Sequence, residues 1–413
     1  MNINGGPPAE RRVDLIFFDA GGGHRAAAAA LAAAARDQGR SWQPNPVNLR
    51  DLLGPLDFIR NSIGVRFEDF YNAMLSHGLT VATGPMLRLA QTLIALRHKR
   101  AVQALAGHWQ TQAPALVMSL IPNFNRAIFE GLRAADDAAR RPPTPMVTVL
   151  TDLADYPPHF WIERQEQYFI CGSARAAEQA RAMGHPPQRI FQTSGMIVRP
   201  EFYQPAPLNR DHERRRLGLA AQLPTGLVMF GGFGSRRMIA IARRVAAARL
   251  DTQLIFLCGY NQPLARRLSA MRLSFPHHVE GFTPRPHYFM RLADYFIGKP
   301  GPGSLSEAWL MGLPVIVERN ARTMVQERYN TEWIEQQRLG VVLSSFRHIA
   351  RGIAPMLDAA QLAGFRARVG ALDNRAVFEI PAIVDQLIAS PPHRTAGQSL
   401  HVDGRDLGEA DSA

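Results

Sequence analysis

Short apolar runs alternate with longer helical stretches along most of this chain. His24 to Arg36, for example, is rich in alanine and has the length of a helix. Such alternation is typical of an open, parallel α/β sheet. In the first half, the runs predicted to be strands are Val13–Phe18, Ala115–Leu120, Met146–Leu150 and Gln167–Cys171.

The pattern pauses between Gly195 and Asn209, where three prolines predict a linker, and then it restarts. We therefore expect two doubly wound, Rossmann-like domains, 13–200 and 201–385, with a flexible N-terminus (1–12) and a disordered tail (391–413). Ligands of such sheets bind beyond the carboxyl ends of the strands, which predicts a cleft between the domains. The strands predicted in the second half are Gly226–Phe230, Gln253–Cys258, Tyr295–Ile297 and Pro314–Val317.

Composition narrows the class of protein. The chain has 413 residues, 46% hydrophobic and 20% charged, as in ordinary globular proteins. Its two cysteines, Cys171 and Cys258, are too few for a disulfide framework or a four-cysteine zinc site. No apolar run approaches the roughly 20 residues of a membrane-spanning helix, and residues 1–10 lack the regions of a signal peptide. We therefore expect a cytoplasmic protein.

The net charge of +12 raises the question of an anionic partner. Lys99 and Lys299 are the only lysines, and the many arginines are spread over the chain, as GC-rich codon usage would produce. Nucleic acid is therefore disfavoured, and an anionic membrane surface explains the charge at least as well. The segment from Leu52 to Arg100 combines apolar residues with a basic end. It fits either a segment that dips into a bilayer or two amphipathic core helices.

A glycine-rich turn lies between the first predicted strand and helix. Gly21, Gly22 and Gly23 let peptide N–H groups approach an anion or a substrate hydroxyl. The next residue, His24, suits a general base because its pKa lies near neutrality. A tight turn with a solvent-exposed histidine is the alternative interpretation.

A second group of polar residues follows the strand predicted at Met146–Leu150. Asp152 comes directly after that strand, where it could orient His24 or act as the base itself. A turn or helix-capping aspartate is the alternative. Further along, His159 and Trp161 fit either an acceptor pocket or simple packing.

A third motif, Ile297 to Ala308, predicts a strand, a Gly/Pro loop and a helix. Ser304 with Glu307 three residues later has the pattern of a capping box. The same turn could instead hold a diphosphate on its free N–H groups, with Glu307 accepting hydrogen bonds from ribose hydroxyls. Further along, Gln326 and Glu327 could bind vicinal sugar hydroxyls, or could mark a solvated helix start.

Together these residues resemble the monogalactosyldiacylglycerol synthase and processive diacylglycerol glucosyltransferase family. That family consists of GT-B enzymes, distantly similar to the N-acetylglucosaminyltransferase that makes lipid II. The resemblance spans roughly residues 13 to 385. The residues that carry it are Gly21–Arg25, Thr151-Asp152, His159, Trp161, Gly231–Gly234, Lys299–Ser304, Glu307-Ala308, Gln326-Glu327 and Asn330.

The resemblance implies an inverting transferase that moves a hexose from a UDP-sugar to a membrane lipid, most simply diacylglycerol, at the cytoplasmic membrane face. It implies His24 and Asp152 as catalytic residues and an acceptor loop of Gly22, Gly23, Arg25, His159 and Trp161. No metal or other cofactor is expected. The donor site would comprise Gly232, Gly234, Phe282, Lys299, Gly301, Gly303, Ser304, Glu307, Gln326, Glu327 and Asn330.

Donor sugar and acceptor stay open at this point. Tyr156-Pro157-Pro158 and the stretch from Glu318 to Val325 depart from the family pattern. Galactose, glucose and N-acetylglucosamine are all candidate sugars. The rival functions are a UDP-sugar 2-epimerase of the same architecture and a non-enzymatic, basic nucleic-acid-binding protein.

Overall fold

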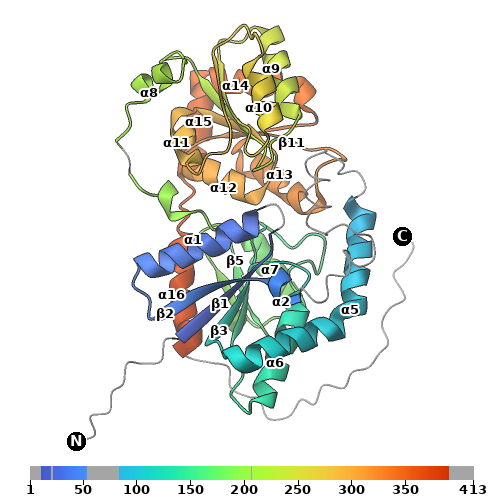
Figure 1. Ribbon diagram of the computed structural model, residues 1–413. Helices are drawn as coiled ribbons and strands as arrows, with labels where there is room; N and C mark the ends of the chain where they lie inside the picture. Colours follow the sequence, from blue (N-terminus) through green and yellow to red (C-terminus); the bar gives the residue numbers. More distant parts are fainter. Residues whose placement is uncertain (1–10, 20–21, 54–82, 206, 390–413) are drawn as a thin grey trace, which may run out of the picture.

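The computed structural model describes residues 11–19, 22–53, 83–205 and 207–389, and it contains two parallel sheets in two halves of the chain (Figure 1). Each sheet has six strands, and every strand pair is parallel. All eight predicted strands are present, within two residues of their expected bounds.

The first sheet has the order β2-β1-β3-β4-β5-β6. Its strands are β1 (Arg11–Phe17), β2 (Trp42–Asn48), β3 (Leu116–Ser119), β4 (Met146–Val149), β5 (Tyr168–Cys171) and β6 (Ile190–Gln192). The helices of this half are α1 (Gly23–Asp37), α2 (Leu49–Leu53), α5 (Thr83–Gln112), α6 (Asn125–Ala138) and α7 (Ala174–Ala182). Because β1 begins at Arg11, the last two residues of the expected flexible N-terminus belong to a strand.

The second sheet has the order β12-β11-β10-β7-β8-β9. Its strands are β7 (Thr225–Met229), β8 (Gln253–Leu257), β9 (His277–Glu280), β10 (Tyr295–Gly298), β11 (Val315–Glu318) and β12 (Gly340–Leu343). Its helices are α8 (Arg210–Arg216), α9 (Arg237–Ala248), α10 (Gln262–Ser269), α11 (Pro286–Leu292), α12 (Pro302–Leu310), α13 (Val325–Gln337), α14 (Ile349–Leu357) and α15 (Ala359–Gly370).

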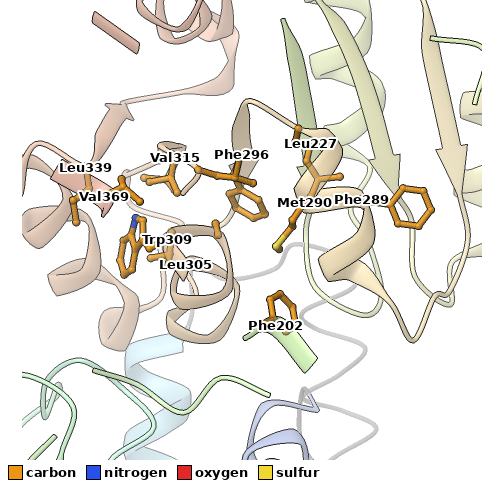
Figure 2. Packing of buried hydrophobic residues seen from close by; sticks show 14 of the residues in the cluster. Phe202, Leu227, Phe289, Met290, Phe296, Leu305, Trp309, Val315, Leu339 and Val369 are labelled. Atoms are coloured by element: carbon orange, nitrogen blue, oxygen red, sulfur yellow. The ribbon is translucent and has the colours of Figure 1, made fainter. Parts of the chain in front are cut away.

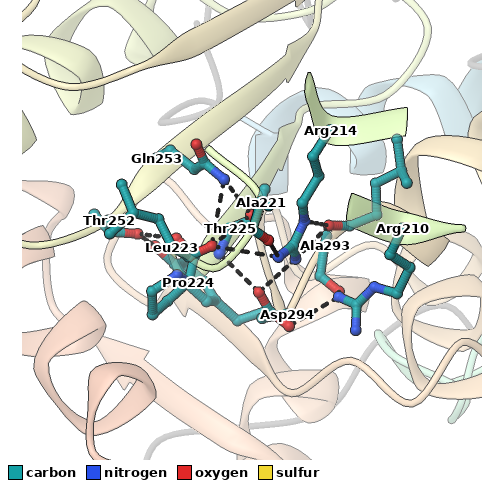
Figure 3. Close-up of polar contacts among 12 residues, drawn as sticks. Arg210, Arg214, Ala221, Leu223, Pro224, Thr225, Thr252, Gln253, Ala293 and Asp294 are labelled. Carbon is teal, nitrogen blue, oxygen red and sulfur yellow. Dashed lines mark hydrogen bonds and ion pairs between the residues drawn. The ribbon is translucent and has the colours of Figure 1, made fainter. Parts of the chain in front are cut away.

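Asp294 ties the amino end of this second sheet together (Figure 3). Its carboxylate accepts hydrogen bonds from Arg214 at 2.7 Å, from Arg210 at 2.9 Å and from the Thr225 N–H at 2.8 Å. Arg366 of α15 adds a fourth bond at 2.7 Å. One carboxylate therefore joins α8, α15 and the starts of β7 and β10. This contact lies at the amino ends of the strands, whereas ligands bind at their carboxyl ends.

The expected linker is anchored in the core of the second half. Met196, Val198 and Phe202 belong to the same buried cluster as Leu227 and Phe296 of the sheet (Figure 2). Phe202 lies in the short 3-10 helix η3 (Pro200–Phe202). Burying a large aromatic ring stabilises the folded protein by about 1.5–3 kcal/mol. The connection is therefore fixed to the second half and is not a flexible linker.

The final helix, α16 (Ala376–Ala389), returns to the first half, and it lies beside α1 in Figure 1. Ile380 and Val384 are buried in the core cluster that contains β1 and α1. Asp385 accepts hydrogen bonds from Arg40 at 2.6 Å and from the Trp42 indole at 2.8 Å. The expected second domain, 201–385, therefore extends too far, because residues from 376 onward pack with the first half.

Much of the segment from Leu52 to Arg100 lies outside the described residues, and so does the predicted tail 391–413. The described part of the segment ends in α5, where Leu96 is 74% exposed. On the same helix, the His98 Nε2 lies 2.6 Å from the Glu130 Oε2. Among the helices that are described, none combines the length and the apolar character needed to cross a membrane.

Candidate active site

His24 occupies the first turn of α1, directly after the glycine-rich turn. Gly22 precedes the helix with φ 80°, a conformation that glycine adopts without strain, whereas Gly21 lies outside the described residues. The His24 Nδ1 lies 3.3 Å from the Thr151 hydroxyl. Burial lowers the pKa of His24 to about 4, although a hydrogen bond to the Leu120 backbone opposes this. At neutral pH the imidazole is therefore uncharged and can accept a proton.

Asp152 lies three residues beyond the end of β4 and is buried. Its Oδ2 accepts a hydrogen bond of 2.9 Å from the Trp161 indole N–H. Burial raises the pKa of Asp152 to about 7, and the Trp161 hydrogen bond opposes this shift. The negative charge of Glu327 raises the pKa further, whereas the positive charge of Lys299 lowers it. Asp152 is therefore poised between its charged and neutral forms near neutral pH.

Asp155 organises the loop that carries Asp152. Its two carboxylate oxygens accept the peptide N–H groups of His159 at 3.0 Å and Trp161 at 2.6 Å. His159 is exposed, but Trp161 has no exposed surface. The ring of Trp161 is packed on all sides, and its assignment to the acceptor loop stays a prediction. Arg25 is exposed and lies 3.3 Å from Asp19, beside the turn that contains Gly23.

The capping box expected at Ser304 and Glu307 is wrong. α12 begins at Pro302 with Gly301 as its N-cap, and no side chain caps it. Proline is favoured at the first helical position because its fixed φ suits the helix. The helix therefore starts before Ser304, which had been expected to cap it. The Leu305 N–H makes the first intrahelical bond, to the Gly301 carbonyl at 3.1 Å. The N–H groups of Gly303 and Ser304 precede it, as an anion site at a helix start requires.

Lys299 and Glu327 meet over this turn. The Lys299 Nζ lies 2.8 Å from the Glu327 Oε1, and Glu327 is buried. A Cβ on Gly301 would lie 3.2 Å from the Lys299 side chain and 3.3 Å from Glu327, so glycine allows this close approach. Asn330, also buried, donates to the Pro300 carbonyl at 2.7 Å. Gln326 turns elsewhere, toward the sulfur of Met324 at 3.7 Å.

Glu307 lies one and a half turns into α12 and faces the linker. Its Oε1 is 3.8 Å from the Arg199 Nε, and burial raises the pKa of Glu307 to about 7 while Arg199 opposes the shift. The Arg199 side chain also donates to the Pro284 carbonyl at 3.3 Å, just after the Gly281-Phe282-Thr283 loop. Glu307 thus has a charged partner from the segment that connects the two halves.

The glycine-rich turn after β7 packs tightly against the turn after β8. The Gly232 carbonyl accepts the Tyr260 N–H at 2.8 Å, and Gly234 has φ 58°. A Cβ on Gly234 would lie 2.8 Å from the Cys258 carbonyl oxygen, so only glycine fits there. Phe282 is half-exposed, and its ring stacks on that of Tyr260 with centroids 4.1 Å apart.

The two halves meet at these residues. Asp152 from the first half lies within the electrostatic influence of Lys299 and Glu327 from the second half. Tyr156, on the same loop as Asp152, has its ring centroid 6.0 Å from that of Tyr329 on α13. The structure therefore brings together both expected catalytic residues and part of the expected donor site.

Solved structures identify this two-domain arrangement. Acinetobacter baumannii MurG superposes with a TM-score of 0.54, at 11% identity over 91% of this chain and 99% of that one. WaaG, a glycosyltransferase of lipopolysaccharide biosynthesis, gives 0.52, at 13% identity over 94% of this chain and 100% of that one. Anabaena HepE, solved with UDP and glucose, gives 0.51, at 15% identity over 92% of this chain and 100% of that one. The fold is GT-B.

Sequence comparison adds the family resemblance. No family model matches the chain. Monogalactosyldiacylglycerol synthase from Spinacia oleracea is 31% identical over 252 residues, which cover 58% of this chain and 47% of that protein. A probable monogalactosyldiacylglycerol synthase from Nicotiana tabacum is 29% identical over 296 residues, 69% of this chain and 54% of that protein. The resemblance to monogalactosyldiacylglycerol synthases is confirmed. The chain spans about half the length of these curated relatives.

Some residues of this GT-B site gave no usable signal in the sequence. Asp155 has the spacing of an ordinary turn aspartate, and Arg199 is one of many arginines. Tyr260 lies in a turn whose sequence has no recognisable binding motif. Each gains its place only through a partner distant in sequence, which a local pattern does not contain.

Within the described parts of the chain, no three His, Cys, Asp or Glu side chains form a group that could hold a metal ion. The expectation that the reaction needs no metal or other cofactor stays a prediction. So do the roles of the individual site residues.

Proposed function

We propose that this protein is an inverting glycosyltransferase that moves a hexose from a UDP-sugar to a lipid at a membrane surface. One observation carries the proposal. Asp152 lies within the electrostatic influence of Lys299 and Glu327 from the second half, and His24 lies beside its neighbour Thr151, so the candidate base and the candidate donor site would share one region of a GT-B fold. The similarity to monogalactosyldiacylglycerol synthases supports the same reaction class.

The donor would bind to the second half. The N–H groups of Gly303 and Ser304, with the positive end of the α12 dipole, suit the diphosphate. Glu307 would accept hydrogen bonds from the ribose hydroxyls, and the Gly281-Phe282-Thr283 loop would contact the uracil. Glu327 and Asn330, both buried beside Pro300, would bind the sugar together with Gln326. Lys299 would balance charge between Glu327 and the phosphates.

The chemistry is a single displacement at C1 of an α-linked sugar. A base removes the proton of the acceptor hydroxyl, whose oxygen forms a bond to C1 while the bond from C1 to the phosphate oxygen breaks. The electron pair leaves on UDP, where the helix start of α12 stabilises the new charge. Attack from the opposite face inverts the anomeric centre. His24, neutral at pH 7, and Asp152, partly ionised there, are both candidates for the base.

The names of the relatives and the surface of α5 support a lipid acceptor. Diacylglycerol is the first acceptor to test, because the relatives are named for its galactosylated product. Leu96 is exposed on α5 close to the exposed Lys99 and Arg100, a combination that suits an anionic membrane surface. We propose peripheral attachment to the inner face of the cytoplasmic membrane.

Calorimetric titration with UDP, with ADP as the competitor nucleotide, tests the donor site directly. We expect UDP to bind selectively and Glu307→Ala to weaken that binding by tenfold or more, because the ribose loses two hydrogen bonds. Glu166→Ala is the matched control, since Glu166 also pairs with an arginine, Arg189 at 3.2 Å, but lies at the far side of the first half. Folded protein that ignores UDP would overturn the proposal.

A UDP-sugar 2-epimerase is the alternative that the structural neighbours keep open. A structure described as a UDP-N-acetylglucosamine 2-epimerase from Listeria monocytogenes superposes with a TM-score of 0.52 at 16% identity, which shows the fold alone. Incubation with each UDP-sugar, with and without diacylglycerol-containing vesicles, separates the two functions. A transferase releases UDP only when the lipid is present, whereas an epimerase converts the sugar nucleotide without it.

A further inference from the structure

Trp161 contacts both candidate bases. Its indole N–H donates to the Asp152 Oδ2 at 2.9 Å, and its ring centroid is 6.0 Å from that of His24. Its own peptide N–H is held by Asp155 at 2.6 Å, and its side chain is fully buried. The indole is thus fixed from both ends, and the direction of its N–H is fixed with it.

The titratable and charged groups around Asp152 come from three parts of the molecule. Asp155 lies on the same loop, and His24 lies on α1 next to Trp161. Lys299 and Glu327 approach from the second half as a closed ion pair. Burial and the two other carboxylates favour a protonated Asp152, and of these neighbours the Trp161 N–H is the largest influence that favours the carboxylate.

We infer that Trp161 is a positioning residue that favours the ionised form of Asp152 and aims it at the acceptor, an inference that rests on the proposed transferase function. A hydrogen bond donated to a carboxylate stabilises the charged form of the group. It also fixes which of the two oxygens faces away from the donor. The Oδ2 is occupied by the indole, so the Oδ1 is the atom left to face the substrate. A purely structural Trp161 would fill space and leave the charge of Asp152 unaffected.

The chain offers a matched control in Trp109. Trp109 is also fully buried, and its indole N–H also donates to a buried carboxylate, the Asp14 Oδ2, at 3.1 Å. Asp14 is the central residue of β1, whereas His24 lies beyond the carboxyl end of that strand. Replacing either tryptophan by phenylalanine removes the same kind of hydrogen bond, but only one of the two lies at the candidate site.

The first test is the pH profile of kcat/KM for wild type, Trp161→Phe and Trp109→Phe. Loss of the donor raises the pKa of Asp152, so the acidic limb of the Trp161→Phe profile should move upward by about one pH unit. We expect roughly tenfold lower kcat/KM at pH 6 and a much smaller loss at pH 9. The limb of Trp109→Phe should stay where it is. A loss for Trp161→Phe that is equal at all pH values would overturn the inference.

A second readout does not depend on activity. Infrared titration follows the carboxyl band of Asp152, which the difference between wild type and Asp152→Asn identifies. The band should titrate near pH 7 in wild type and at higher pH in Trp161→Phe. An unshifted band overturns the role of Trp161, whereas a shifted band in a protein without transferase activity overturns only the proposed function. If the phenylalanine variant fails to fold, 3-benzothienylalanine at position 161 keeps the bicyclic ring without the N–H, and the same outcomes apply.

Discussion

At the scale of single residues, three residues of the candidate site share burial without a full partner. His24, Asp152 and Glu307 all have pKa values moved toward the neutral form, and burial is the largest cause for each. A group whose neutral form is favoured in the empty protein responds strongly when a charged substrate arrives. Asp294, which is held by three arginines, shows the opposite behaviour, since those partners keep its pKa low. It serves stability instead.

Removing the His24 imidazole tests the base. Because His24 is neutral at pH 7 and lies at the start of α1, we expect His24→Ala to lower kcat by on the order of 10²–10⁴, the usual effect of losing a general base. UDP affinity should change little, since the donor residues lie on the other half. The measurement is steady-state turnover beside UDP titration, with the exposed His348→Ala as control. A variant that retains most of its turnover would leave Asp152 as the base.

At the scale of elements, the turns after β7 and β8 form one packed unit. A Cβ at Gly259 would lie 2.0 Å from the Gly232 carbonyl oxygen, and one at Gly234 would meet the Cys258 carbonyl. These turns are therefore held in shape before any nucleotide binds. Such preorganisation is what a site made largely of peptide groups needs.

Substitution of Gly234 by alanine should damage this unit. We expect Gly234→Ala to lower the free energy of unfolding by about 1–3 kcal/mol, because the new Cβ adds a backbone clash to an unfavourable positive φ. Gly218→Ala is the control, since Gly218 has φ 74° with no atom within 4 Å of the added Cβ. Urea unfolding with and without UDP measures both. Equal losses for the two variants would mean that the contact between the turns adds nothing.

The interior strands of both sheets could be predicted from the sequence, and the strands that were missed are the edges. β2, β6, β9 and β12 are the outermost strands of their sheets. These edge strands are less buried than the interior strands, and β2 even contains Pro44 and Pro46, which an edge tolerates. The start of α12 was misplaced for a related reason, because Pro302 and Ser304 are both good helix-start residues and only the backbone decides between them.

At the scale of the whole molecule, the first and last described elements, β1 and α16, belong to the same half. α16 buries Ile380 against β1 and α1, so the second half is inserted between β6 and α16. This return was not predictable from local pattern, because α16 reads as one more amphipathic helix whichever half it covers. Packing against a distant surface decided its place.

Truncating Ile380 should therefore weaken a half that is distant in sequence. We expect Ile380→Ala to cost about 2–5 kcal/mol and to reduce hydrogen-exchange protection in β1 and β3, because it opens a cavity in their shared core. Ile353→Ala on α14 is the matched control, since Ile353 is buried in a core cluster of the second half that contains residues of β7 and β8. It should lower protection in β8 and spare β1. The reverse pattern would contradict the assignment of α16 to the first half.

The return of α16 also means that the backbone passes between the halves twice. The two passages touch, since the Asn374 amide donates to the Met196 carbonyl at 2.9 Å and the Ser194 N–H reaches Glu379 at 2.9 Å. A domain joined to another by one connection can rotate in any direction. Two adjacent connections restrict the rotation of one half relative to the other to a single hinge axis. Arg199 lies between Val198 and Phe202, which are anchored in the core of the second half, so an opening about that axis would leave Arg199 paired with Glu307.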